Sequence, residues 1–188
     1  KETVNITSTF GKKQPDLYLI AIGESEFQQT EFNLTYAAKD AKDMTNLFKD
    51  SKAFKNVFTK TLTNNEVTAN SVKDLKSFLA QADINDQVMI FIAGHGVLNE
   101  DLDYCCATYD MDFNNPKEKG MPFDTLENLF EDLSCRNKLL MIDACFSGEI
   151  DKTSLRVDTN NFENKDDIQF RSNQLAAIDG NGDMGIFE

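Results

Sequence analysis

The sequence lacks any apolar run long enough to cross a membrane, although 40% of its 188 residues are apolar. A membrane-spanning helix needs about 20 consecutive apolar residues, so we predict no membrane partner. No signal peptide is visible after Lys1. We expect a single globular domain with a sizeable core, cut from something longer.

Positive charge is also scarce. The chain has 19 Lys and Arg residues against 32 Asp and Glu residues, which gives a formal net charge of −13. Nucleic-acid binding needs a basic footprint for the phosphates, so this composition argues against a nucleic-acid partner. An acidic protein favours a basic peptide as its partner instead.

The four cysteines show no Cys-x-x-Cys spacing of the kind that indicates a metal or redox site. Cys105 and Cys106 are adjacent, whereas Cys135 and Cys145 lie far apart in the sequence. This pattern is not a disulfide framework. We therefore predict a protein of the reducing cytoplasm, with no bound metal.

Two short apolar stretches end in residues that can do chemistry. One is Met89–Gly96, which contains the only histidine, His95, and the other is Leu139–Gly148, which contains Cys145. Apolar runs without polar alternation suit strands buried on both faces of a parallel sheet. Chemistry in such sheets collects at the carboxyl ends of the strands. If the two strands are neighbours, they bring an imidazole to a thiol, which is the partner a thiol nucleophile needs.

These stretches resemble the two catalytic boxes of the caspase-like cysteine peptidases of clan CD. The boxes are Ala93-Gly94-His95-Gly96 and Asp143-Ala144-Cys145-Phe146-Ser147-Gly148. The likeness is closer to the metacaspase and bacterial caspase-like branch than to animal caspases. Residues 104–110 also resemble that branch, although Thr108 stands where the branch often has Pro. The resemblance covers about residues 16–150.

The resemblance implies an α/β fold, a three-layer caspase-like sandwich with a mostly parallel central sheet flanked by helices. The order of the apolar segments is typical of such a fold. We expect strands over residues 17–22, 57–62, 87–93, 104–109 and 138–142, and helices over residues 34–48, 71–82 and 124–133. Residues 1–15 are predicted to be a tail or linker, and 16–150 the catalytic large-subunit domain. Residues 151–188 are predicted to be an intersubunit linker and an incomplete C-terminal region.

The resemblance also implies the roles of a Cys-His dyad. Cys145 would be the nucleophile and His95 its proton carrier. The backbone N–H groups of Gly96 and Cys145 would hold the oxyanion. The sequence offers no third residue to orient the histidine.

Specificity for basic residues is predicted from acidic side chains. In the metacaspase branch, an Asp at the position of Asp143 forms part of a pocket for basic side chains. The loop Gly23–Asn33 contains Glu24, Glu26 and Glu31 and no Lys or Arg. We predict that Asp143, Glu24 and Glu26 bind the substrate, and that cleavage follows Arg or Lys, because an acidic pocket attracts a cation and repels a carboxylate.

The C-terminal stretch is predicted to be a cleavable loop. Residues 151–173 are rich in Asn, Asp and Lys and poor in large apolar side chains, as exposed loops are. We predict self-cleavage there, after Lys152, Arg156, Lys165 or Arg171. The strands of a caspase-like small subunit are not evident, so we expect a C-terminal small-subunit piece or a fused sensor or repeat module as a partner.

No cofactor is predicted. Residues 179–183 resemble the start of an EF-hand loop, but Met184 occupies the position that requires glycine. We interpret this segment as a turn. The resemblance to metacaspases implies calcium activation, for which we assign no ligands.

Two alternatives to a peptidase stay open. One is a catalytically silent caspase-like scaffold that binds partners through the same cleft. The other is a flavodoxin-like binding domain, which would need a phosphate-binding loop after the first strand. The segment Gly23-Glu24-Ser25-Glu26 is acidic and not glycine-rich, which is wrong for phosphate.

Overall fold

The computed structural model describes residues 14–101 and 103–146, and for Cys145 and Phe146 it describes the backbone alone. The predicted cleavage sites, the C-terminal region and most of the predicted N-terminal tail therefore lie outside the described residues. Among the helices of the described ranges, none is both long and apolar enough to cross a membrane.

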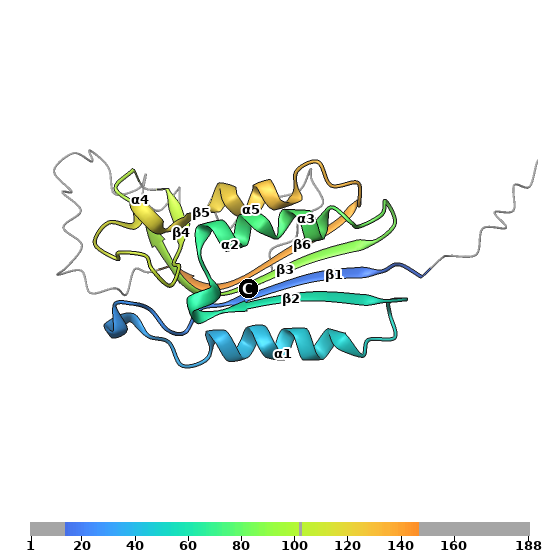
Figure 1. Cartoon of the computed structure of the whole chain (residues 1–188), viewed down its shortest axis with the longest axis horizontal. Helices are drawn as coiled ribbons and strands as arrows, with labels where there is room; N and C mark the ends of the chain where they lie inside the picture. Colours follow the sequence, from blue (N-terminus) through green and yellow to red (C-terminus); the bar gives the residue numbers. More distant parts are fainter. Residues whose placement is uncertain (1–13, 102, 147–188) are drawn as a thin grey trace, which may run out of the picture.

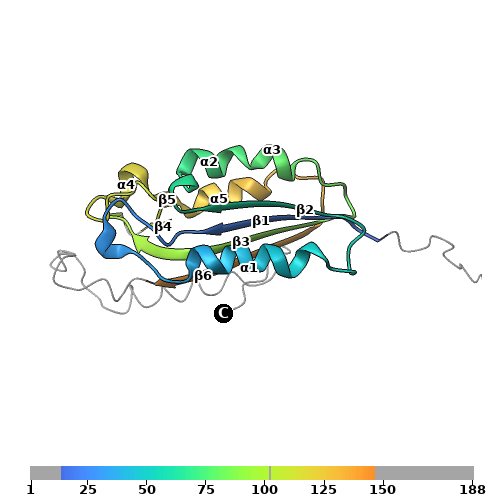
Figure 2. The same ribbon diagram turned by 60° about the horizontal axis from the view of Figure 1, so that its bottom comes forward.

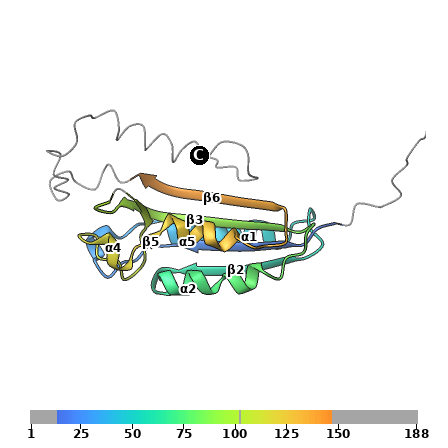
Figure 3. The same ribbon diagram turned by 90° about the horizontal axis from the view of Figure 1, so that it is seen from above.

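The centre of the molecule is a six-stranded sheet with the order β2-β1-β3-β4-β5, in which β6 also pairs with β3. Figure 3 shows β6 beside β3 on one side of β1, and β2 on the other. The strands are β1 (Leu17–Gly23), β2 (Val57–Thr63), β3 (Gln87–Leu98), β4 (Tyr104–Cys106), β5 (Met121–Pro122) and β6 (Asn137–Phe146).

Four of these strands are parallel, and they form the apolar middle of the sheet. β1 pairs in parallel with both β2 and β3, and β6 pairs in parallel with β3. All seven residues of β1 are buried. Burial on both faces explains why the sequence of this strand shows no polar alternation.

The prediction of a mostly parallel sheet is wrong, because the sheet is mixed. β3 continues past its predicted end to Leu98, and β4 returns antiparallel to it, followed by β5 antiparallel to β4. The connection from β3 to β4 is a short turn closed by a backbone hydrogen bond, which the Asn99 N–H donates to the Asp103 carbonyl at 3.0 Å. A parallel pair needs a crossover of a dozen or more residues, so this short turn permits only an antiparallel return.

Helices lie on both faces of the sheet (Figures 1 and 2). α1 (Ala37–Lys49) covers one face, and α2 (Ala69–Asp74), α3 (Lys76–Leu79) and α5 (Phe123–Phe130) cover the other. The short helices η1 (Thr30–Phe32), η2 (Asn64–Glu66) and α4 (Pro116–Lys119) lie in connecting segments. The second predicted helix is divided at Leu75, whose N–H donates to the Val72 carbonyl one residue closer than in an α-helix.

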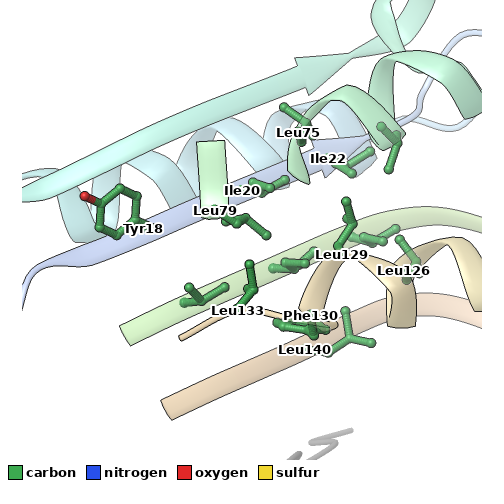
Figure 4. Close-up of a cluster of buried hydrophobic side chains, with 14 of the residues drawn as sticks. Tyr18, Ile20, Ile22, Leu75, Leu79, Leu126, Leu129, Phe130, Leu133 and Leu140 are labelled. Carbon is green, nitrogen blue, oxygen red and sulfur yellow. The ribbon is translucent and has the colours of Figure 1, made fainter. Parts of the chain in front are cut away.

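The larger part of the core lies between the sheet and the helices α2, α3 and α5. Figure 4 shows side chains from β1, β6 and these helices meeting there, among them Ile20, Leu79, Leu126, Leu129 and Leu140. Smaller clusters lie on the α1 face, where Leu19, Ala21 and Phe91 are buried. Burial at about 25 cal/mol per Å² of apolar surface makes these clusters the main source of stability.

Gly23 sets the distance between β1 and α1, and we predict that Gly23→Ala is destabilising. A Cβ at this position would lie 2.2 Å from the Ala37 carbonyl oxygen and 2.7 Å from the Ala41 Cβ. Because the first of these is backbone, the helix itself must shift, at a cost of about 1–3 kcal/mol. Urea unfolding measures the difference.

Gly94→Ala is the matched control, because the nearest atom to its Cβ would be 3.5 Å away, which is ordinary contact. Its free energy of unfolding should stay close to that of the wild type. Equal stability of the two variants would contradict the packing argument.

Candidate active site

The parallel register of β3 and β6 places His95 directly beside Cys145. The two residues are Cα partners near the carboxyl ends of their strands, and the ladder between these strands runs from Gln87 to Gly96 on β3. Partners in a sheet occupy the same face of it. The two residues that the sequence singled out are therefore neighbours at the end of the sheet where chemistry is expected.

The imidazole of His95 is held by a backbone carbonyl. Its Nε2 lies 2.8 Å from the carbonyl oxygen of Phe32, the last residue of η1. A carbonyl oxygen only accepts hydrogen bonds, so Nε2 carries the proton and donates it. In the neutral ring, Nδ1 is then the basic nitrogen.

Two phenylalanine rings pack against this imidazole, and a third stacks on one of them. The centroids of Phe27 and Phe113 lie 5.4 Å and 5.7 Å from that of His95, and Phe32 stacks on Phe113 at 3.8 Å. Their packing fixes the η1 segment over the histidine, so the carbonyl of Phe32 stays within reach. The structure thus supplies the orienting group that the sequence did not reveal. The available signal was the presence of two phenylalanines, Phe27 and Phe32, in the acidic loop Gly23–Asn33.

Asp143 lies on β6, two residues before Cys145, and it is exposed. Its partner in the register is Ala93 on β3. Ala93 precedes His95 by two residues, so both belong to the same face of the strand. The structure therefore brings Asp143 to the face of the sheet that carries His95.

Glu24 lies elsewhere. Its N–H donates to the Ala93 carbonyl at 3.0 Å. Its Cβ is the atom nearest to the position that a Cβ on Gly94 would occupy, at 3.5 Å. Gly94 alternates with Ala93 and His95 along β3, so Glu24 occupies the opposite face of the sheet. Glu26, the third acid of the predicted pocket, is exposed in the loop after β1. The structure does not gather the three predicted acids at one point.

The carboxyl group of Glu24 is buried without a partner. Only 2% of the residue is exposed, and within the described ranges neither carboxylate oxygen has a hydrogen-bond partner. Burial, reinforced by repulsion from Glu26 and Asp110, raises its pKa to about 9. Glu24 is therefore a neutral acid at pH 7, because the charged form would lose its hydration without compensation.

Gly96, the predicted oxyanion donor, is buried between β4 and β6. The carbonyl of the preceding residue, His95, accepts a hydrogen bond of 2.8 Å from Ala107, next to β4. Backbone groups of successive strand residues point to alternate sides. The N–H of Gly96 therefore faces β6, the strand that carries Cys145.

These features define a class: an α/β protein in which a cysteine and an oriented histidine are neighbours at the ends of adjacent parallel strands. Residues 18–179 match the family described as caspase domain, and the chain belongs to that family. Membership excludes the flavodoxin-like alternative. The match is to the caspase domain as a whole and does not single out the metacaspase branch.

The fold is similar to that of a solved structure. The chain is similar to protein GSU0716 from Geobacter sulfurreducens, with a TM-score of 0.56 and 19% sequence identity. The similarity covers 71% of this chain and 52% of that one, so this chain spans about half of the solved protein. No curated protein matches the sequence. Within the described residues, no three His, Cys, Asp or Glu side chains are grouped so as to hold a metal ion.

The buried acid predicts a pH-dependent stability. The pKa of Glu24 is about 9 in the folded chain and 4.5 without perturbation, so the folded state retains a proton that the unfolded state loses. Stability should therefore fall as the pH rises through this window, by at most about 1.4 kcal/mol per pH unit. Glu24→Gln removes the titration and keeps the shape. Its advantage over wild type in urea unfolding should grow from about pH 5 to about pH 8.

Glu31→Gln is the control for this measurement, since Glu31 is exposed in the same loop. Its stability should follow the wild-type curve. Parallel pH profiles for wild type and Glu24→Gln would show that Glu24 does not titrate as described.

Proposed function

We propose that the protein is a cysteine endopeptidase in which Cys145 and His95 form a catalytic dyad. The observation that carries the proposal is the register that makes the two residues partners at the strand ends. The Phe32 carbonyl supports it, because a hydrogen bond to Nε2 leaves Nδ1 of His95 free to exchange a proton. This is the arrangement of an activated nucleophile and its oriented base.

The reaction would proceed through an acyl-enzyme. The thiolate of Cys145 attacks the peptide carbonyl carbon, and His95 gives a proton to the leaving amine as the C–N bond breaks. A water molecule then attacks the thioester, with His95 accepting its proton. The acid product leaves, and the thiol is restored.

Developing charge on the carbonyl oxygen would be held by two backbone donors, the N–H groups of Gly96 and Cys145. The Gly96 N–H points toward β6 within the ladder that pairs Gly96 with Phe146, so this role requires the two strands to part at their carboxyl ends. Removing one donor of this kind typically costs about 2.7–4 kcal/mol of transition-state stabilisation.

The substrate in this proposal is a peptide or protein segment with Arg or Lys before the scissile bond. Asp143 supplies the recognising charge, because it is exposed on the same face as His95 and lies two residues from the nucleophile. Glu26 adds an exposed negative charge. Glu24 is buried and neutral on the opposite face of the sheet, so in this arrangement of the loop its carboxyl group does not contribute to recognition.

Thiol labelling separates a peptidase from a silent scaffold. Burial raises the pKa of the thiols of Cys105, Cys106 and Cys135, that of Cys106 to about 12, so these thiols should resist alkylation at neutral pH. We predict that iodoacetamide labels Cys145 rapidly and that His95→Ala slows this reaction. Slow labelling that does not depend on His95 would favour the scaffold.

Hydrolysis and self-processing are measured on the same proteins. His95→Ala should lower peptide hydrolysis by about 10²–10⁴-fold, the usual contribution of acid–base catalysis. Cys145→Ala should abolish it. Mass spectrometry should find wild-type chains cut after Lys152, Arg156, Lys165 or Arg171 and Cys145→Ala chains uncut.

Asp143→Asn tests the specificity. We predict that it lowers kcat/KM for Arg-ending fluorogenic peptides by about tenfold while leaving Asp-ending peptides poor substrates, because one attractive charge is lost. Glu131→Gln, an exposed acid at the end of α5, is the control and should change neither value. Preference of the wild type for Asp, or an unchanged Arg preference in Asp143→Asn, would rule out this role.

A further inference from the structure

The helix η1 has no buried residue of its own. Its last residue, Phe32, nevertheless supplies the carbonyl that holds the imidazole of His95. A hydrogen bond from the Leu34 N–H to the Ser25 carbonyl, at 2.9 Å, brings the two ends of the surrounding loop together. This bond shapes the loop but does not locate it relative to the histidine, so contacts with another segment must do so.

Those contacts come from residues 107–115, the segment that follows β4. Figures 1 and 2 show this segment and the loop after β1 at the same end of the sheet. Gln29, the residue before η1, joins the two, because its side-chain Oε1 accepts a hydrogen bond of 2.7 Å from the Phe113 N–H. One main-chain bond also crosses between them, from the Gln28 N–H to the Tyr109 carbonyl at 3.0 Å.

Gln29 also closes the turn of η1. Its main-chain carbonyl accepts from the Phe32 N–H at 3.1 Å, and the Phe32 carbonyl in turn lies 2.8 Å from Nε2 of His95. The segment after β4 is itself tied to the histidine, because its first residue, Ala107, donates its N–H to the His95 carbonyl at 2.8 Å. Four hydrogen bonds therefore lead from the main chain of His95, through Phe113 and Gln29, back to its imidazole.

This circuit depends on residue type at one acceptor. The other three acceptors are main-chain carbonyls, which every amino acid provides. Within the described residues, the acceptor for the Phe113 N–H is the Gln29 side chain. Phe113 is buried, and a buried donor that loses its acceptor is costly, so removal of Oε1 favours a rearrangement of the two segments. Such a rearrangement would carry the Phe32 carbonyl away from His95.

We propose that Gln29 is a positioning residue for His95, which keeps the Phe32 carbonyl on Nε2 and so leaves Nδ1 as the nitrogen that exchanges a proton. The inference rests on the proposed peptidase function for its effect on the reaction, whereas the contact with the imidazole is measurable without catalysis. A histidine that is held in one tautomer and one orientation needs no rearrangement when proton transfer begins.

The test observes His95 directly by NMR. It is the only histidine, so isotopically enriched histidine in the full-length chain gives the ring signals of one residue. A ring N–H that is bonded to a carbonyl exchanges slowly with water, so the wild type should show a resolved Nε2–H proton signal. Gln29→Leu removes the acceptor at similar size, and Gln29→Asn withdraws it by shortening the side chain. Gln29→Glu keeps an acceptor oxygen at the same reach.

We expect Gln29→Leu and Gln29→Asn to lose the Nε2–H signal to exchange and to lower kcat by about tenfold, a part of the roughly 10²–10⁴-fold contribution of acid–base catalysis. KM should change by less than about twofold, because the lost interaction serves the transition state. Gln29→Glu should retain the signal and most of kcat. Gln28→Leu is the matched control and should change neither, because Gln28 is exposed and contributes its main chain to the contact.

Each contrary result has a distinct meaning. A signal that persists in Gln29→Leu and Gln29→Asn, or a kcat that stays unchanged when the signal is lost, overturns the role of Gln29 alone. Equal losses in Gln28→Leu or Gln29→Glu assign the effect to the loop rather than to the acceptor oxygen, and they also overturn the proposal. A wild type that shows neither hydrolysis nor His95-dependent alkylation overturns the peptidase function and this inference together.

Discussion

The parallel ladder between β3 and β6 is the constraint on which the site depends. It fixes which residue of one strand lies beside which residue of the other, and a slip of one position would move His95 or Cys145 to the opposite face. The ladder starts at Gln87 and Asn137, far from the site, so its register is set by many residues that do no chemistry. Helices on both faces then press apolar side chains against these strands. The relative position of His95 and Cys145 is therefore set by the buried strands that carry them.

The sequence was sufficient to predict the strands of the parallel region and the two residues at their ends. Strands buried on both faces leave uninterrupted apolar runs, and a single histidine leaves no competing choice of base. The antiparallel return of β4 was not predicted, because the resemblance implied a mostly parallel sheet and the apolar pattern does not mark the short Asn99–Asp103 turn that joins the two strands. Local turn geometry, rather than apolar pattern, decides strand direction there.

The parts of the site that the sequence could not supply are contacts between segments distant in the chain. The acceptor for His95 is a backbone carbonyl, and every residue has one, so no residue type marks it. The charge of the acidic side chains was also not predictable from the sequence. Glu24 and Asp143 are both carboxylic acids in the sequence, but Glu24 is buried and neutral whereas Asp143 is exposed. Only the three-dimensional surroundings of a carboxyl group reveal whether it carries charge.

The carbonyl that holds His95 has a consequence for how this site would look to mutagenesis. Every amino acid at position 32 provides the same oxygen, so an alanine scan removes the Phe32 ring but never the acceptor itself. What a substitution can change is the path of the chain through η1, which depends on stacking against Phe113. Side-chain replacement therefore cannot measure the contribution of the Phe32 carbonyl to the site. Replacing the amide linkage with an ester, which weakens the carbonyl as an acceptor, would address that atom directly.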